Sequence, residues 1–256
     1  MNQPETDTEN WYERAFRSEY LEVYPARTVK SAEAEVAAAL NWLQLNEGAR
    51  LLDLCCGAGR HSRWLRESPI ELHGLDLSKD LLAEARRLLA DSVSLHQGDM
   101  RQLPFVDQFF DAVVMFFTSF GYFPTDEENY QVLTEVARVV RPGGSFLLDL
   151  PDRDSTANGL VPVSDREVGD LKIHEERRMT ADGLRVEKTV TLIGPGGEDH
   201  YTESVRLFLR DDIEEMLQKR GWESIDCRGD WDGSTHGSGA SPRMIFTAKK
   251  MSGGVG

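Results

Sequence analysis

The stretch Leu51–Ser62, LLDLCCGAGRHS, decides how the rest of this 256-residue chain is interpreted. An apolar run ends near the carboxylate Asp53, and two cysteines and the glycines Gly57 and Gly59 follow it. The apolar run predicts a buried strand at 49–55, and the glycines allow a sharp turn whose backbone can approach a ligand closely. A helix that begins after such a turn points its N-terminal amides at that ligand. The stretch is compatible with a nucleotide site, a thiol site or an empty turn.

Strands and helices alternate on both sides of this turn. The expected strands are 49–55, 70–76, 92–97, 110–117 and 145–150. The expected helices between them are 59–67, 78–89 and 125–140, the last two beginning at the caps Ser78 and Thr125. This rhythm predicts an α/β fold, a doubly wound and mostly parallel sheet covered by helices on both faces.

The pattern of apolar and polar residues changes after residue 150. Polar segments with period-two alternation predict antiparallel strands, at 169–179, 184–193 and 200–208. A helix capped by Asp211 and strands at 222–229 and 242–249 then complete a seven-stranded sheet. We therefore expect three parts. They are an N-terminal helical cap over 1–45 (with helices at 11–24 and 31–45), a core of 46–150 and 210–250, and an inserted antiparallel unit over 151–209 that forms a substrate lid or a dimer surface.

Composition and charge narrow the classes of partner. The chain is 40% hydrophobic and carries a formal net charge of -15, which argues against binding mainly through phosphates, as in a nucleic-acid partner. No apolar run approaches the ~20 residues of a membrane span, and the polar N-terminus does not resemble a secretory signal. Cysteine spacing suits neither zinc nor a disulfide, so we expect free thiols and a cytoplasmic location: Cys55, Cys56 and Cys227.

Further carboxylates follow the next two strands. Asp76 ends the second strand, nineteen residues after Gly57, where an ionised carboxylate can accept both hydroxyls of a ribose. Asp99 follows the third strand and can accept from an adenine amino group, while the backbone N–H of Met100 can reach a ring nitrogen. Ser62 stands where the dinucleotide motif GxGxxG has its third glycine, which disfavours a nicotinamide oxidoreductase.

Together these segments resemble a known family. DLCCGAG, from Asp53 to Gly59, resembles motif I of the class I S-adenosylmethionine-dependent methyltransferases, (D/E)xGxGxG, with Cys55 at the first glycine. HGLDLS, QGDMRQLPF, FDAVVMFFTSFGYF and ARVVRPGGSFLLDL resemble the later motifs in the same order. The resemblance covers residues 10–150 most clearly. It implies a Rossmann-like methyltransferase fold that uses S-adenosylmethionine and releases S-adenosylhomocysteine.

The resemblance also implies the roles of individual residues. Motif I would hold the methionine end, Asp76 and Leu77 the ribose and adenine, and the aromatic segment after the fourth strand the methyl acceptor. The cofactor-binding residues implied are Tyr20, Tyr24, Asp53, Cys55, Gly57, Gly59, Arg60, Asp76, Leu77, Asp99, Met100 and Phe116. The acceptor-binding residues implied are Phe117, Phe120 and Tyr122. No metal site is expected.

A catalytic base is required only if the acceptor carries a proton at the moment of attack. The candidates are Tyr20, His61, Tyr122 and His236. The other histidines are expected to be structural in core strands, as His73 and His96, or solvated on the insertion, as His174 and His200.

The resemblance implies a methyltransferase for a small molecule. It favours nitrogen over oxygen, because a member of this family with an antiparallel insertion after strand five is similar to amine and sugar-amine N-methyltransferases. A homodimer is compatible with this prediction. Two alternatives stay open: a nucleic-acid methyltransferase, and a binding module that holds the nucleoside without turnover.

Overall fold

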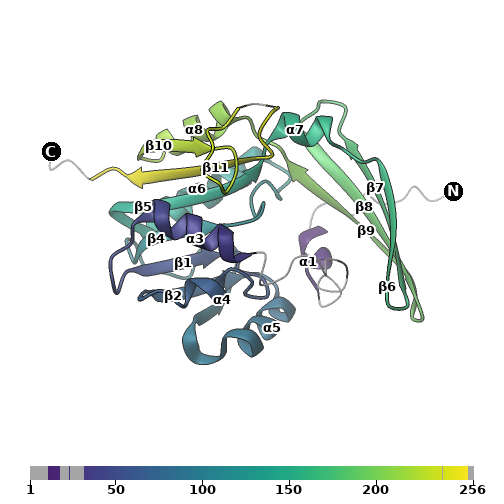
Figure 1. Ribbon diagram of the computed structural model, residues 1–256, viewed down its shortest axis with the longest axis horizontal. Coiled ribbons are helices and arrows are strands. Elements are labelled where there is room, and N and C mark those ends of the chain that lie inside the picture. Colours follow the sequence, from purple (N-terminus) through teal and green to yellow (C-terminus); the bar gives the residue numbers. More distant parts are fainter. Residues whose placement is uncertain (1–10, 18–22, 24–31, 238, 253–256) are drawn as a thin grey trace.

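The computed structural model describes residues 11–17, 23, 32–237 and 239–252, which form two β-sheets with helices around the larger one (Figure 1). Two predicted site residues, Tyr20 and Tyr24, lie outside the described residues. Within the described ranges, no helix is long and apolar enough to cross a membrane.

The larger sheet has seven strands in the order β10-β11-β5-β4-β1-β2-β3. The strands β1 to β5 pair in parallel, and β11 and β10 complete one edge in antiparallel fashion. Their bounds are β1 Arg50–Leu54, β2 Glu71–Asp76, β3 Ser94–Gln97, β4 Phe110–Met115, β5 Val140–Pro151, β10 Trp222–Arg228 and β11 Arg243–Lys250. The predicted doubly wound, mostly parallel sheet is confirmed.

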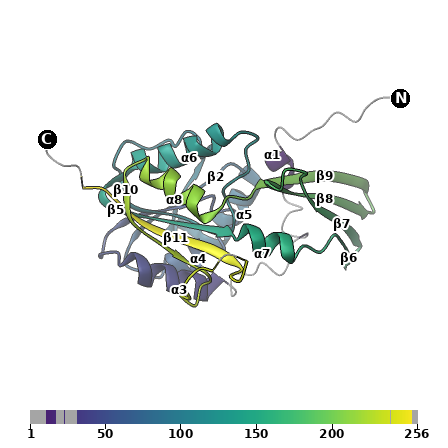
Figure 2. The same ribbon diagram turned by 90° about the horizontal axis from the view of Figure 1, so that it is seen from above.

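Helices cover both faces of this sheet (Figure 2). One face carries α3 (Ala32–Leu43), α4 (Ser62–Leu65) and α5 (Lys79–Leu89), and the other carries α6 (Asp126–Val139) and α8 (Arg210–Gln218). Strands buried on both faces explain the continuous apolar runs of β1, β4 and β5.

The helix caps test the local sequence signals. Ser78 and Thr125 cap α5 and α6 as predicted. In each case the hydroxyl oxygen accepts from the backbone N–H three residues later, that of Leu81 or Glu128. The cap predicted for Asp211 is wrong. The helix α8 begins at Arg210, and the Asp212 carboxylate accepts from the N–H of Leu209 at 2.9 Å.

The sheet reverses its winding direction beside β1, which lies between β4 and β2. In open α/β sheets, ligands bind outside the carboxyl ends of the strands at such a switch point. The glycine turn after β1 is therefore placed where this architecture positions ligands.

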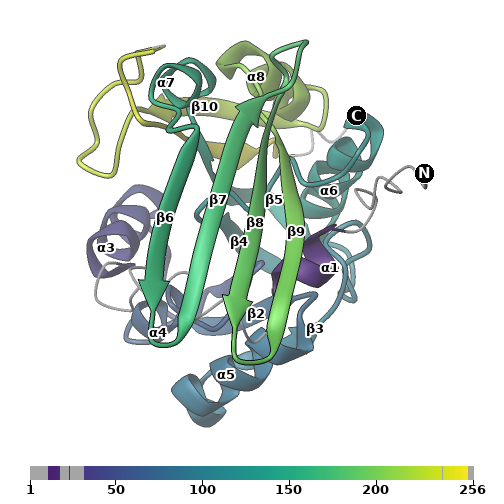
Figure 3. The ribbon, with the colours of Figure 1, turned by 90° about the vertical axis from the view of Figure 1, so that its right-hand side faces the viewer.

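The smaller sheet is the antiparallel insertion after strand five (Figure 3). Its strands run in the order β6 (Val163–Val168), β7 (Leu171–Met179), β8 (Arg185–Gly194) and β9 (Gly197–Arg206). Three of these strands match the predicted segments. The strand β6, whose side chains are at best half-buried, and the short helix α7 (Arg153–Asn158) were not predicted.

Arginines fasten this sheet to the loop after β4. The guanidinium of Arg185 donates to the carbonyl oxygens of Phe123 at 3.1 Å, Gly121 at 3.4 Å and Ser204 at 2.9 Å. The N–H of Arg206 donates to the carbonyl oxygen of Gly121 at 2.7 Å. The insertion therefore supports a loop that also lines the cavity described below.

Candidate active site

A cavity of about 730 Å³ opens at the carboxyl ends of β1, β2, β3 and β4. This volume lies within the range of small-molecule sites, roughly 300–1,000 Å³. Most predicted site residues within the described ranges line it: Cys55, Gly57, Arg60, His61, Asp76, Leu77, Asp99, Met100, Phe116, Phe117 and Tyr122.

The floor of the cavity is the turn after β1. Gly57 and Gly59 have φ of +54° and +84°, in the left-handed region that favours glycine. A Cβ on Gly59 would also lie 2.9 Å from a methyl carbon of Leu89, so a larger residue would require that side chain of α5 to shift. Cys55, at the family's first glycine, has φ of +64° and carries a backbone strain of about 1–2 kcal/mol.

Asp53 is 1% exposed and lies beneath this turn. The Ser62 hydroxyl donates to its carboxylate at 2.5 Å. Burial raises the pKa of Asp53 to about 6, partly opposed by that hydrogen bond. Neither Asp53 nor Gly59 is among the cavity-lining residues, so both support the turn from behind instead of facing a ligand.

Asp76 lies half-buried at the end of β2 and faces the cavity. The backbone N–H groups of Gly57 and Ser78 each donate to one of its two carboxylate oxygens, at 2.8 Å. Burial raises the pKa of Asp76 to about 6, against the effect of these two hydrogen bonds. A carboxylate has about four acceptor positions, so the two oxygens can still accept from a diol.

Asp99 follows β3 and is paired with Arg101, a residue the sequence reading missed. The Arg101 guanidinium donates to both Asp99 oxygens, from Nε to Oδ1 at 3.2 Å and from Nη2 to Oδ2 at 2.6 Å. Burial alone would raise the pKa of Asp99, but its hydrogen bonds with Arg101 lower it overall. The guanidinium also lies 4.3 Å from the ring centroid of Phe123, and so links the Asp99 end of the cavity to its aromatic mouth.

The wall of the cavity formed by His61 and Phe116 combines aromatic rings with a charged cluster. The His61 ring stacks on Phe116 with centroids 4.1 Å apart, and its Nε2 lies 2.6 Å from the carboxylate of Glu35 on α3. Burial lowers the pKa of His61, and its hydrogen bond with Glu35 partly opposes this effect. Phe116 also contacts Trp231, which stacks in parallel on Trp42. Local sequence signals did not identify Glu35, because it comes from a distant helix.

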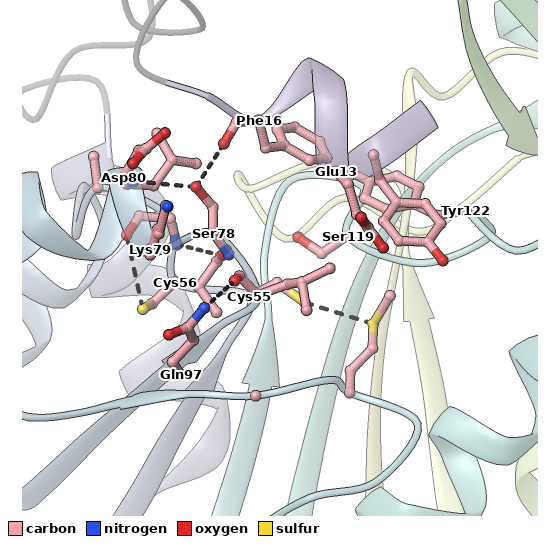
Figure 4. A pocket seen from close by; sticks show the side chains of 18 of the residues that line it. Glu13, Phe16, Cys55, Cys56, Ser78, Lys79, Asp80, Gln97, Ser119 and Tyr122 are labelled. Carbon is pink, nitrogen blue, oxygen red and sulfur yellow. Dashed lines mark hydrogen bonds between the residues drawn. The ribbon is translucent and has the colours of Figure 1, made fainter. Parts of the chain in front are cut away.

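The mouth of the cavity is aromatic and carries an exposed carboxylate. The helix α1 (Trp11–Ala15) and Phe16 cover it, and the Phe16 ring stacks on Tyr122 at 5.6 Å. Glu13 lies beside Tyr122, across the cavity from Ser78 (Figure 4). The Ser78 hydroxyl donates to the carbonyl oxygen of Phe16 at 2.5 Å, which joins the start of α5 to the end of α1.

Two predicted site residues lie elsewhere. Phe120 is fully buried and packs against Phe208, because the chain after Phe117 turns back into the core. His236 is also buried, and its Nε2 lies 2.9 Å from Asp152 Oδ2, so its loop folds against α7 instead of overhanging the cavity. Neither lines the cavity.

The remaining histidines and cysteines behave mostly as structural groups. His73 is buried and contacts the half-buried His96, while His174 and His200 lie on the insertion. The three cysteines are free thiols, and burial raises the pKa of Cys55 and Cys56 well above the ordinary value. A buried thiol whose pKa is raised is a poor nucleophile, which disfavours a thiol site at this turn.

The insertion contributes no lining residue among those the structure describes. It reaches the cavity indirectly, through the loop held by Arg185 and through α1, where Arg14 pairs with Asp199 on β9 at 2.6 Å. The insertion therefore supports this cavity from behind.

The chemistry of the lining fits S-adenosylmethionine. Asp76 offers acceptor oxygens for ribose hydroxyls, and the half-exposed Leu77 offers an apolar surface for a base. Asp99 and the backbone of Met100 lie beside it, with the glycine turn at the opposite end.

Comparisons with known proteins agree with this geometry. A family model described as a methyltransferase domain matches residues 51–144. A putative methyltransferase of Bacillus subtilis, YqeM, is 31% identical over 82% of this chain and 88% of its own length. The dTDP-3-amino-3,6-dideoxy-alpha-D-glucopyranose N,N-dimethyltransferase of Streptomyces fradiae is 34% identical over 74% of this chain and 76% of its own length.

The fold recurs in solved structures. A crystal structure of a S-adenosylmethionine-dependent methyltransferase from Clostridium acetobutylicum superposes with a TM-score of 0.76, at 16% identity, over 91% of this chain and 96% of its own. The switch-point cavity, the carboxylates around it and these relatives lead to one assignment. The chain belongs to the class I S-adenosylmethionine-dependent methyltransferases, and S-adenosylmethionine is its cofactor.

Proposed function

We propose that this enzyme N-methylates a small amine, and that an amino sugar is its first candidate substrate. The observation that carries the proposal is the relative from Streptomyces fradiae, an amino-sugar N,N-dimethyltransferase that aligns over about three quarters of both chains. The formal net charge of -15 also favours a small acceptor over RNA, because RNA-binding proteins need clustered cations.

The mouth of the cavity supports an amine acceptor. The rings of Phe16 and Tyr122 form an aromatic surface beside the exposed carboxylate of Glu13. Aromatic faces and carboxylates both attract an ammonium group, so they concentrate an amine at the entrance. Arg17 supplies an exposed guanidinium at the same mouth, suited to a phosphate carried by the acceptor.

The proposed chemistry needs alignment more than proton transfer. S-adenosylmethionine supplies an activated methyl group when bound. The residues of this chain exclude water and orient the acceptor, an effect worth roughly 7–11 kcal/mol of barrier for well-aligned reactants. A neutral amine needs no base at the moment of attack, and the proton leaves afterwards from the ammonium product. We assign acceptor contacts to Phe117 and Tyr122, and cofactor contacts to Asp76, Leu77 and Asp99.

The experiment incubates the purified protein with S-adenosylmethionine and matched acceptors. The acceptors are dTDP-3-amino-3,6-dideoxyglucose, the corresponding 3-hydroxy sugar, and a structured RNA. Formation of S-adenosylhomocysteine together with a methylated amino sugar is the expected result, and its rate should rise with pH through the pKa of the amine. Methylation of the hydroxy sugar or of RNA, with the amino sugar left untouched, contradicts the proposal.

A further inference from the structure

A second buried carboxylate supports the wall of the cavity from outside it. Asp149 is fully buried near the end of β5, directly behind the segment that leaves β4. Its Oδ2 accepts from the N–H of Phe117 at 2.7 Å, and its carbonyl oxygen accepts from the N–H of Thr118 at 3.0 Å. One residue thus holds two consecutive amide groups of the neighbouring chain segment.

The segment it holds has an unusual backbone. Phe117 and Thr118 have φ of +56° and +61°, so two consecutive residues other than glycine adopt the left-handed region. Side chains disfavour this region because Cβ approaches the carbonyl oxygen. Strain of this kind persists only where the surroundings impose it, and it gathers at functional sites.

Arg243 on β11 completes the clamp. Its Nε donates to Asp149 Oδ1, and its Nη2 donates to the hydroxyl of Thr118 at 3.3 Å. The guanidinium of Arg243 lies 5.7 Å from the ring centroid of Phe117, and that of Arg60 lies 4.9 Å from it. The two guanidinium groups thus contact the Phe117 ring, while Asp149 binds the Phe117 backbone N–H.

The strained segment is also where the chain enters the cavity. Phe117 and Ser119 line it, whereas Asp149 and Arg243 do not. We propose that the Asp149–Arg243 pair is a positioning device: it imposes the left-handed turn at Phe117–Thr118 and so fixes the acceptor wall of the cavity. This inference rests on the proposed function for its catalytic consequence, but its structural part can be tested without an acceptor.

The primary variant is Asp149→Asn. An amide offers one acceptor oxygen to the two donors that now use the two carboxylate oxygens, so either Phe117 N–H or Arg243 loses its partner. Amide hydrogen exchange of Phe117 and Thr118, measured by NMR, should become about tenfold faster or more, while exchange in β1 stays at the wild-type rate. Wild-type exchange at both amides overturns the proposal.

Asp111→Asn is the matched control. Asp111 lies at the opposite end of β4, and it likewise accepts from a backbone N–H, that of Arg50 at 2.7 Å, and from an arginine, Arg141 at 2.5 Å. This variant should leave exchange at Phe117 unchanged. Equal acceleration in both variants indicates general loosening of the sheet and overturns the proposal.

A rescue separates positioning from a general structural role. Glycine adopts positive φ without the Cβ penalty, so Thr118→Gly in the Asp149→Asn background should restore much of the protection at Phe117. A double variant with exchange as fast as the single variant counts against the imposed turn. If Asp149→Asn fails to fold, Arg243→Lys is measured in its place, and unchanged exchange at Thr118 then overturns the proposal.

Kinetics test the catalytic consequence. With dTDP-3-amino-3,6-dideoxyglucose as the probe, Asp149→Asn should lower kcat/KM for the acceptor about tenfold, since small displacements of a wall residue weaken alignment. The Kd of S-adenosylhomocysteine should stay unchanged. An unchanged kcat/KM for the acceptor contradicts the assigned wall. A wild-type protein that methylates no amine refutes the proposed function alone, and the exchange data still decide whether the pair imposes the turn.

Discussion

The carboxylate of Asp76 accepts a hydrogen bond from the backbone N–H of Gly57 at 2.8 Å, across nineteen positions of sequence. The contact joins the end of β2 to the glycine turn after β1. It fixes the carboxylate at the edge of the cavity, and it makes the turn and the carboxylate one unit.

Asp76→Ala should therefore weaken binding of S-adenosylmethionine by more than about tenfold, because it removes the proposed ribose acceptor and leaves the Gly57 N–H without its partner. Isothermal calorimetry with S-adenosylmethionine and S-adenosylhomocysteine checks this, and NAD should not bind to the wild-type protein. Asp91→Asn, at an exposed position of the 3-10 turn after α5, is the control. Unchanged affinity of Asp76→Ala would remove the basis of the site assignment.

Cofactor binding should depend on pH near the raised pKa of Asp76, about 6. Only the ionised form of Asp76 accepts from both ribose hydroxyls, so affinity should fall as pH drops below about 6. The folding stability of the ligand-free protein should instead rise as pH drops. A carboxyl with a raised folded-state pKa stabilises the fold below its unfolded pKa, and this contribution is lost as pH rises through the folded pKa.

Thermal unfolding with and without S-adenosylhomocysteine, between about pH 5 and pH 7.5, measures both effects together. The shift in Tm caused by the ligand should shrink toward low pH. In Asp76→Asn the pH dependence should flatten. A ligand-induced shift that is constant across this range contradicts the proposed role of Asp76.

Substitutions of Cys55 measure the backbone strain in motif I. Cys55→Gly removes the penalty of φ +64° but loses the contact of the thiol with Met100 at 3.5 Å, whereas Cys55→Ala loses the contact and keeps the penalty. The glycine variant should therefore be about 1 kcal/mol more stable than the alanine variant, as measured by urea unfolding. Equal stability of the two variants shows that the turn relaxes when the thiol is removed.

A substitution of Arg185 tests how the insertion is attached to the loop after β4. The compact ammonium of lysine lacks the planar fork with which the Arg185 guanidinium reaches three separate carbonyl oxygens, so Arg185→Lys should lower the free energy of unfolding by about 2 kcal/mol. It should also raise the acceptor KM, because the loop of Gly121 and Phe123 loses its support. Arg178→Lys is the control, since the side chain of Arg178 is 78% exposed in its pair with Glu187 and such pairs contribute about 0–1 kcal/mol. Matching losses in the two variants contradict a specific attachment.

The parts of the fold predicted from sequence are those with strong local signals. Asp53, Asp76 and the cap Ser78 follow from strand ends and capping patterns, and the structure places them accordingly. The strand β6 was missed because its side chains alternate only between exposed and half-buried positions, so no apolar period marks it.

The site was harder to predict where its contacts depend on tertiary structure. Asp149 also stands near the carboxyl end of a buried strand, the pattern that singled out Asp53, but no glycine turn follows it. Glu35 and Arg243 reach the cavity wall from α3 and β11, and nothing in their local sequence marks them. Phe120 was predicted to contact the acceptor because it belongs to the aromatic run 116–123. The sequence of that run does not reveal the left-handed turn at Phe117, which directs Phe120 into the core.

The contact between Phe116 and Trp231 has a practical consequence. Their ring centroids lie 5.6 Å apart, and Trp231 stacks on Trp42 at 5.5 Å with planes 3° apart. Indole emission is sensitive to its surroundings, and Phe116 forms part of the cavity wall. A ligand that shifts Phe116 therefore changes the intrinsic fluorescence of the tryptophan pair, so the chain contains its own optical reporter for titrating nucleosides and acceptors without a label.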